Sequence, residues 1–166
     1  GRPAIADVAR TTAALTGLGA AGAIGVAVGL LGGDRRQGAN LAAAIGPDLA
    51  LALAGVKLNV TNEEHLWSRR PAVFIFNHQS SIDVAVIGSL IRRDLTGVAK
   101  KEAARDPRFA PIGYVADVVY VDRSNSKQAR AALKPAVDRL KAGTSIAIAP
   151  EGTRSPTPKL GRFKKG

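Results

Sequence analysis

Residues Pro71–Asp83 read PAVFIFNHQSSID, which predicts a strand followed by a helix with a histidine at the turn between them. The first half is a short apolar run of Val, Ile and Phe behind a proline, as is typical of a buried strand. The segment DVAVIGSLI that follows favours a helix, with Ser80 or Ser81 as its N-cap. We therefore expect His78 in the turn and Asp83 in the first turn of the helix.

The turn between His78 and Asp83 matters for their chemistry. On one continuous helix, a spacing of five residues would place the two side chains on different faces, whereas a turn lets the carboxylate fold back onto the imidazole. A carboxylate on one ring nitrogen fixes the tautomer and leaves the other nitrogen as a base for a hydroxyl proton. Taken alone, this spacing more often marks a structural histidine and an acid favoured by the helix dipole.

The composition limits the possible chemistry. With 166 residues and 46% hydrophobic content, the chain can form one domain with a core. It contains no cysteine, which excludes disulfides, thiolate metal sites and a cysteine nucleophile. Two histidines without cysteine argue against zinc, while a carboxylate site for Mg²⁺ stays open. Since even an initiator methionine is missing, we expect the chain to be part of a longer protein.

The net charge of +11, from 24 Lys and Arg against 13 Asp and Glu, predicts an anionic partner. Nucleic acid, anionic lipid and a phosphorylated substrate all fit this charge. Nucleic acid is disfavoured because aromatic residues make up only 4% of the chain and the basic residues are spread over many segments. We therefore expect a lipid or phosphorylated partner and no nucleic acid.

The N-terminal third predicts two helices in series. Residues 11–33 carry no charge and are long enough to cross a bilayer, but their Ala and Gly supply little transfer free energy, so they either span it, lie in one leaflet or pack on a neighbour. Gly25 and Gly29 form a GxxxG pair suited to close helix contact. A second apolar segment, residues 39–56, contains Gly46–Asp48, which should kink or break it.

We expect residues 1–55 to form a membrane-associated helical hairpin and residues 56–166 to form a second unit. The alternative for the hairpin is a soluble, Ala-rich helix pair packed on the domain. Beyond it, the sequence predicts short strands at Val56–Val60, Leu95–Ala99, Val118–Val121 and Thr144–Ala149, and an amphipathic helix at Ser126–Lys141. Strands that alternate with helices indicate an α/β fold with ligands at the carboxyl ends of the strands.

Three blocks at these strand ends, NHQSSID (77–83), YVDR (120–123) and PEGTRS (150–155), resemble in the same order the blocks of the glycerolipid acyltransferases. That family includes 1-acylglycerol-3-phosphate acyltransferase. The resemblance covers about Val56–Gly166, and a fourth block of the VPIVPV kind is absent. It implies a glycerol-3-phosphate acyltransferase-like sheet with flanking helices, preceded by a helical hairpin in contact with membrane.

The resemblance implies a role for each block. His78 would be the base and Asp83 its orienting partner, with an oxygen of Asp83 within hydrogen-bond reach of the imidazole. A phosphomonoester needs more than one cation to stay bound, and an arginine fork matches its oxygens. The phosphate-binding residues would be Arg123, Arg154 and Lys100, with Lys101 as the alternative to Lys100. Supporting residues would be Asn77, Glu151, Gly152 and Thr153, where Glu151 equally suits pairing with an arginine or capping of backbone amides.

The expected reaction is transfer of an acyl chain from acyl-CoA or acyl carrier protein to the hydroxyl of lysophosphatidate, giving phosphatidate without a metal or other cofactor. Glycerol-3-phosphate or another lysophospholipid is the alternative acceptor, since the glycerol-3-phosphate enzymes often carry glycine in place of Thr153. A hydrolase or thioesterase would want GxSxG glycines, which Ser80 lacks. A non-enzymatic basic membrane-binding domain gives no reason for three blocks at strand ends. We expect an enzyme on the cytoplasmic face of a membrane.

Overall fold

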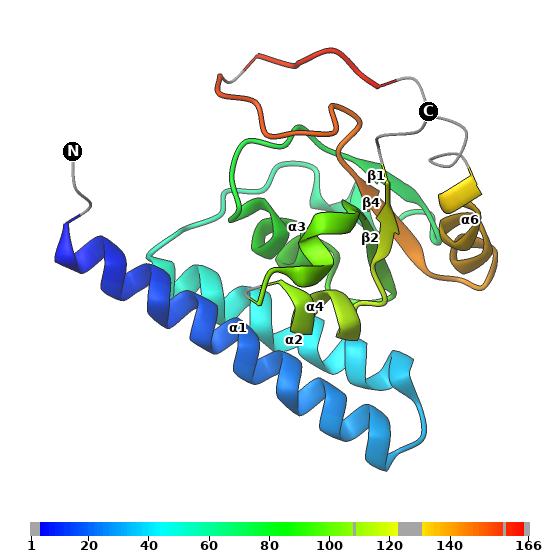
Figure 1. The fold of residues 1–166 in the computed structure, drawn as a ribbon, viewed down its shortest axis with the longest axis horizontal. Helices are drawn as coiled ribbons and strands as arrows, with labels where there is room; N and C mark the ends of the chain where they lie inside the picture. The colour runs from blue at the N-terminus through cyan, green and yellow to red at the C-terminus, as the bar shows by residue number, and fades with distance from the viewer. Residues whose placement is uncertain (1–3, 108, 123–130, 158, 165–166) are drawn as a thin grey trace.

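A parallel four-stranded sheet lies at the centre of the protein, between helices on both faces (Figure 1). The computed structural model describes residues 4–107, 109–122, 131–157 and 159–164. The strands are β1 (Val73–Ile75), β2 (Leu95–Lys100), β3 (Val119–Val121) and β4 (Ser145–Ile148), and their order across the sheet is β1-β4-β2-β3. Because every pair is parallel, all four carboxyl ends meet at one edge. These strands confirm the four that the sequence predicts beyond residue 70.

Two antiparallel helices, α1 (Ile5–Leu31) and α2 (Arg35–Ala54), form the expected hairpin. The connection begins at Gly32, and Gly33 adopts a φ of 67° that glycine tolerates. The carboxylate of Asp34 then caps α2 by accepting the N–H groups of Arg36 at 2.9 Å and Gln37 at 3.2 Å.

Glycines bring the two helices into backbone contact, as the GxxxG pair predicts. A Cβ added to Gly25 would lie 2.5 Å from the carbonyl oxygen of Gly38 on α2, and one added to Gly38 would collide with the backbone of Gly25 and Gly29. No larger residue fits at these positions without moving the helices apart.

The sequence predicts that Gly46–Asp48 kink or break the second apolar segment, and of these the break is wrong, because α2 runs without interruption through Pro47. A proline inside a helix costs about 3 kcal/mol. Pro47 is buried against α3 (Asp83–Ile91), where a Cβ on Gly88 would lie 2.7 Å from the proline ring. Packing between α2 and α3 therefore offsets the cost of the proline, which in the sequence alone indicates a helix end.

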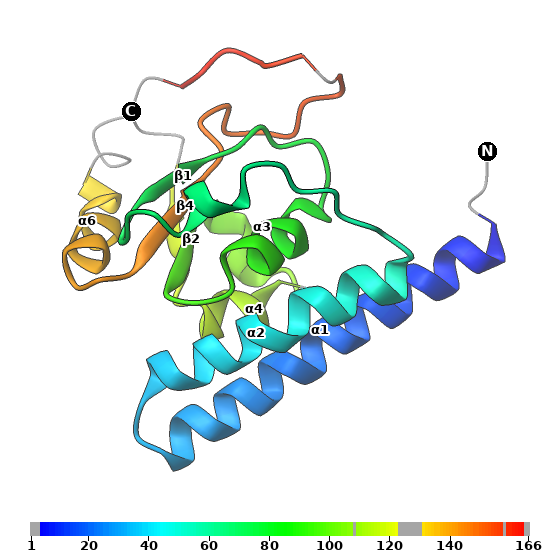
Figure 2. The same ribbon diagram turned by 180° about the vertical axis from the view of Figure 1, so that it is seen from behind.

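The helices cover the sheet in an uneven way. On one side α3 lies between the sheet and the hairpin, as Figures 1 and 2 both show, together with α4 (Ala110–Val115). A first apolar core joins α1, α2 and α3 through Ala14, Ala50, Leu51 and Ala85. On the other side α6 (Lys134–Lys141) packs on the sheet, and a second core forms from Val119, Val121, Ala136 and Ile146.

The remaining segments are short. Two 3₁₀ turns occur at Glu63–Leu66 and Lys101–Arg105. The predicted strand at Val56–Val60 is wrong: these residues have no strand partner in the described part of the chain, and Val56 and Val60 are exposed, so the apolar run has no sheet to join. The predicted helix at Ser126–Lys141 is described only from residue 131 onward, where its last two turns form α6.

Helix α1 is long and apolar enough to cross a membrane, judged by length and composition. Only 28% of its most apolar window is buried against the rest of the protein. Its first turns project beyond the domain (Figure 2), and Ile5 and Val8 there are exposed. At the other end of the helix, Leu30 and Leu31 are exposed as well.

Candidate active site

The turn after β1 brings His78 onto Asp83. Nδ1 of His78 lies 2.7 Å from Oδ2 of Asp83, and the two side chains are 26% and 20% exposed. With the carboxylate as acceptor, Nδ1 donates its N–H, and Nε2 is left with a lone pair. The contact expected from the sequence is therefore present, in the arrangement that prepares an imidazole to accept a proton.

The same carboxylate oxygen of Asp83 organises the turn itself. It accepts the backbone N–H groups of Gln79 at 2.8 Å and Ser80 at 2.9 Å. Burial raises the pKa of the Asp83 carboxyl, but the hydrogen bonds from Ser80, His78 and Gln79 outweigh it, and the net pKa lies below the ordinary value. Asp83 is therefore ionised at neutral pH.

The predicted N-cap at Ser80 or Ser81 is wrong. Helix α3 begins with Ile82 in the N-cap position, and no side chain caps it. The ionised carboxylate of Asp83 instead accepts the backbone N–H groups of the residues before the helix, because it is a stronger acceptor than a serine hydroxyl. Ser81 uses its hydroxyl elsewhere, as an acceptor for Arg154.

The third block lies against the first. The backbone N–H of Ser155 donates to the carbonyl of His78 at 2.7 Å, and Nη1 of Arg154 donates to Oγ of Ser81 at 3.0 Å. This proximity follows from the sheet, where β4 is the neighbour of β1. Beyond the paired residues, the N–H of Phe76 donates to the carbonyl of Ile148. Gly152 supports the turn between β4 and Arg154 with a φ of 74°.

Glu151 is buried beside this turn, with only 4% of its surface exposed. Its Oε2 accepts the backbone N–H of Gly161 at 2.7 Å. Its Oε1 is buried and has no hydrogen-bond partner among the residues that the structure describes. A Cβ on Gly161 would lie 2.5 Å from Oε2, so only glycine allows this approach. Of the two structural roles open to Glu151, the structure shows capping of a backbone amide.

The predicted phosphate-binding cations occupy different positions. Arg154 lies beside the His78 turn through its bond to Ser81. Lys100 ends β2 and is exposed, without an ion pair to any described residue. Its neighbour Lys101 is engaged by the carboxylate of Asp122, which follows β3. Arg123 lies outside the described residues. Two of the other supporting residues are exposed: Asn77, which precedes His78, and Thr153, which precedes Arg154.

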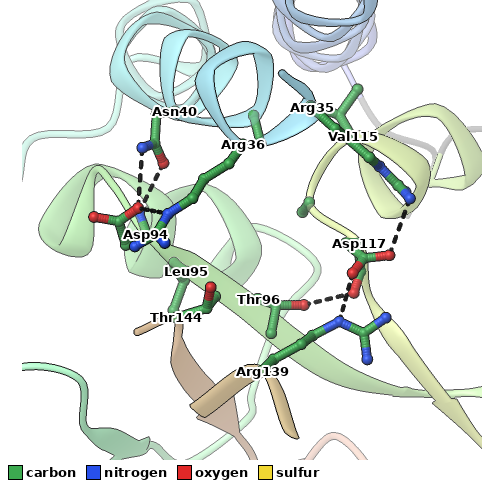
Figure 3. Close-up of a pocket in the computed structure, with 12 residues that line it drawn as sticks. Arg35, Arg36, Asn40, Asp94, Leu95, Thr96, Val115, Asp117, Arg139 and Thr144 are labelled. Atoms are coloured by element: carbon green, nitrogen blue, oxygen red, sulfur yellow. Dashed lines mark hydrogen bonds and ion pairs between the residues drawn. The ribbon is translucent and has the colours of Figure 1, made fainter. Parts of the chain in front are cut away.

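A cavity of about 210 Å³ lies at the opposite edge of the sheet, near the amino ends of the strands (Figure 3). Its charged lining consists of Arg35, Arg36, Asp94, Asp117 and Arg139, none of which belongs to the three blocks. Within the described ranges, no group of three or more His, Asp or Glu side chains is placed to hold a metal ion.

The sequence model of a known family, named Acyltransferase, matches residues 57–166. The chain belongs to the acyltransferase family. Among curated acyltransferases, a 1-acyl-sn-glycerol-3-phosphate acyltransferase of Cocos nucifera is 37% identical over 108 residues, which are 64% of this chain and 35% of the relative. One from Limnanthes alba is 34% identical over 119 residues, or 71% of this chain and 42% of the relative.

A solved acyltransferase shares the fold of this one. The crystal structure of the 1-acyl-sn-glycerophosphate acyltransferase PlsC from Thermotoga maritima matches with a TM-score of 0.61 and 25% identity, over 89% of this chain and 65% of that one. The chain spans less than half the length of the curated acyltransferases described above. The α/β sheet with an N-terminal helix pair, expected from the sequence, is thus confirmed for this acyltransferase.

Sequence reasoning missed the residues that join the blocks. The sequence indicates Ser81 only as a possible N-cap and Ser155 only as the last residue of the third block, yet these two serines connect the first and third blocks. Gly161 gave no signal at all, because its partner Glu151 is ten residues away in an irregular segment. A hydrogen bond between distant loops depends on strand order, which a single sequence does not reveal.

Proposed function

We propose that this acyltransferase moves an acyl chain from acyl-CoA or acyl carrier protein to the free hydroxyl of 1-acylglycerol-3-phosphate, giving phosphatidate. The observation that carries the proposal is the 2.7 Å contact between His78 and Asp83 at the carboxyl end of β1. The names of the similar acyltransferases support the choice of acceptor. In this proposal residues 56–166 form the acyltransferase domain and residues 1–55 the membrane element.

The geometry supports general base catalysis by His78. Nε2 takes the proton of the acceptor hydroxyl while the hydroxyl oxygen attacks the thioester carbonyl carbon, and Asp83 stabilises the imidazolium that forms. When the tetrahedral intermediate collapses, the carbon–sulfur bond breaks and the imidazolium gives its proton to the departing thiolate, which leaves as the thiol. Backbone amides or a cation near the turn would stabilise the oxyanion.

Arg154, Lys100 and Arg123 would bind the acceptor phosphate. Arg154 is the best supported of them, since its bond to Ser81 uses one of its five N–H donors and holds the guanidinium beside the His78 turn. Lys100 is favoured over Lys101 because Asp122 already engages Lys101. The strongly basic chain, with a net charge of +11, suits an anionic lipid substrate. Asn77, Glu151, Gly152 and Thr153 would shape the loops that carry these groups.

The hairpin would hold the enzyme at the cytoplasmic face of a membrane. Support comes from α1, an apolar helix whose surface is mostly uncovered and whose first turns extend past the domain. An acceptor with one acyl chain resides in the bilayer, so an enzyme attached to the same surface meets it there.

An acyl-transfer assay on the full-length protein, with purified acyl-CoA, tests the proposal. Lysophosphatidate, glycerol-3-phosphate and a lysophospholipid without a terminal phosphate are compared as acceptors, with a His65→Ala variant as control for the His78→Ala variant. We expect the parent to form phosphatidate from lysophosphatidate. We expect His78→Ala to lose this transfer activity and His65→Ala to keep it. Preference for glycerol-3-phosphate would correct the acceptor, and thioester hydrolysis that no acceptor accelerates would indicate a thioesterase.

A further inference from the structure

The start of α2 docks on the loops that lead into β2, β3 and β4, at the sheet edge opposite His78 (Figure 3). Two consecutive arginines, Arg35 and Arg36, reach from the first turn of α2 toward two aspartates, Asp94 and Asp117, that precede β2 and β3. We call these four residues the arginine clamp. The sequence shows the two arginines only as the polar end of an apolar run.

Arg36 ties the hairpin to two of these loops at once. Its Nε lies 2.6 Å from Oδ1 of Asp94, and its two terminal nitrogens donate to the carbonyls of Ala142 at 3.3 Å and Gly143 at 3.1 Å. Asn40, one turn further along α2, donates to Oδ1 of Asp94 at 3.1 Å and accepts the Asp94 N–H at 2.8 Å. The bond from Arg36 holds the pKa of Asp94 below its ordinary value.

Arg35 forms the second half of the clamp. Its Nη1 lies 3.2 Å from Oδ1 of Asp117, and its guanidinium stacks at 4.6 Å over the ring of Tyr114 on α4. The other oxygen of Asp117 accepts Nε of Arg139, from α6, at 2.5 Å. Asp117 therefore links the hairpin to a helix on the far face of the sheet.

The backbone at both aspartates is specialised for these contacts. Asp94 has a φ of 49° and Asp117 a φ of 51°, in the left-handed region that residues other than glycine rarely adopt. Such conformations persist where the surrounding structure requires them. Every arginine among the described residues that line the cavity is paired with one of these aspartates, so these residues offer no unpaired cation to an anionic ligand.

A second contact holds the middle of α2 to the helix that begins at Asp83. Pro47 packs on Gly88 of α3, and the carboxylate of Asp48 bonds to Ser89 and, at 3.0 Å, to Arg92. This contact lies at the middle of α2, whereas the clamp lies at its start, beside the turn of the hairpin.

We propose that Arg35 and Arg36 are positioning residues that fix the angle between the hairpin and the sheet, and so hold the His78 edge at a constant distance from a membrane that contains the hairpin. This inference rests on the proposed function, because it takes the hairpin as the membrane element. The acceptor hydroxyl lies at the lipid surface, and a misplacement of about 1 Å from a distant change can cost on the order of 10²-fold in rate. Each ion pair is half-exposed and alone stabilises little, so the network as a whole sets the angle.

Two variants break the clamp from opposite sides. Arg35→Ala with Arg36→Ala removes both cations, and Arg69→Ala with Arg162→Ala is its matched control, since both control arginines lie outside the hairpin, are exposed and make no ion pair with a described residue. Asp94→Asn keeps a residue type that tolerates the left-handed backbone but removes the charge. Because Asp94→Asn makes the protein more basic, weaker attraction to anionic lipid cannot explain a loss that it causes.

The angle is measured by spin labels on the full-length protein in an otherwise cysteine-free background, at Leu30→Cys on α1 and Val137→Cys on α6, both exposed. Transfer is measured with long-chain lysophosphatidate in vesicles and with a short-chain analogue dissolved as monomer. We expect both clamp variants to broaden the label distance distribution, to lower kcat/KM in vesicles about tenfold, and to change kcat/KM for the dissolved acceptor less than about twofold. The Arg69 and Arg162 control should match the parent.

An unchanged distance distribution in the clamp variants, or an equal loss on both acceptors, overturns the inference. The inference is also overturned if the double arginine variant fails to fold while Asp94→Asn folds and behaves as the parent. If the parent transfers to neither acceptor, the proposed function fails, and the distance distributions still decide whether the clamp sets the angle.

Discussion

The amide of Ser155 donates a hydrogen bond to the carbonyl of His78 at 2.7 Å, which joins residues 77 positions apart in the chain. This bond exists because β1 and β4, far apart in sequence, are neighbours in the sheet. It holds the backbone of His78 from one side while Asp83 holds the imidazole from the other. The candidate base is therefore fixed by two loops, and a change in either should affect the reaction.

Replacing His78 by alanine should remove the base. We expect kcat to fall by roughly two to four orders of magnitude, the usual contribution of general base catalysis. The chain has two histidines, so His65→Ala, in the exposed 3₁₀ turn, is the natural control and should keep the parent rate. A His78→Ala enzyme with more than about a tenth of the parent kcat would show that the imidazole is not the base.

Replacing Asp83 by asparagine should change both the rate and the acid stability. The depressed pKa of Asp83 means that its stabilisation is present above the ordinary carboxyl pKa of about 4 and is lost as the pH falls through the folded-state pKa. The stability of the parent to thermal unfolding should therefore fall below about pH 4, and Asp83→Asn should flatten this part of the pH dependence.

At neutral pH the same Asp83→Asn change should lower kcat more than it changes KM, because it disturbs the orientation of His78 and leaves acceptor binding intact. A parent-like pH dependence of stability in this variant would show that Asp83 does not keep its bonds to the turn in solution.

Arg154→Ala should mainly raise KM for lysophosphatidate, as expected when ground state and transition state share a phosphate contact. Arg162→Ala is the control, since Arg162 is also exposed and follows in the same C-terminal segment. Ser81→Ala removes the hydroxyl that accepts from Arg154 and should give a smaller rise in the same direction. Equal losses for an acceptor without phosphate would make Arg154 a structural residue.

Gly161→Ala should destabilise the fold by about 1–3 kcal/mol, because its Cβ would lie 2.5 Å from Oε2 of the buried Glu151. Gly19→Ala is the matched control: a Cβ there meets nothing within 4 Å, and alanine favours the helix that contains it. Urea unfolding of both variants measures the difference. A Gly161→Ala protein as stable as the parent would mean that the Glu151 bond is broken at little cost.

Charges on the projecting end of α1 should weaken membrane attachment without disturbing the fold. Ile5 and Val8 are 90% and 51% exposed, so Ile5→Glu with Val8→Glu removes apolar surface that the protein itself does not use. Sedimentation with anionic vesicles at high salt measures attachment. The control, Val137→Glu on α6, should sediment like the parent, whereas unchanged sedimentation of the α1 variant would place the anchor elsewhere.

The sequence predicts most reliably what depends on neighbours along the chain. The contact between His78 and Asp83 follows from one turn, and the strands follow from short β-branched runs bounded by polar residues. Resemblance to a known family then linked the separate blocks, which local patterns could not do.

The wrong predictions have different physical causes: a competing contact overrode local preference at Pro47 and Ser80, whereas Val56–Val60 has no strand partner among the described residues. Pro47 signals a helix end, but packing on Gly88 keeps α2 continuous. Ser80 signals an N-cap, but the Asp83 carboxylate is the stronger acceptor. In the sequence Arg36 marks only the polar end of an apolar run, and the fold is what brings Asp94 within its reach.

The backbone contact between Gly25 and Gly38 has a consequence for how the protein can be handled. Association through close van der Waals contact does not depend on expelling water, so it operates in hydrocarbon as well as in aqueous solution. A helix pair joined in this way keeps one interface in both solvents. Detergent extraction should therefore leave the two helices paired, and an exchange of lipid for micelle should not require them to repack.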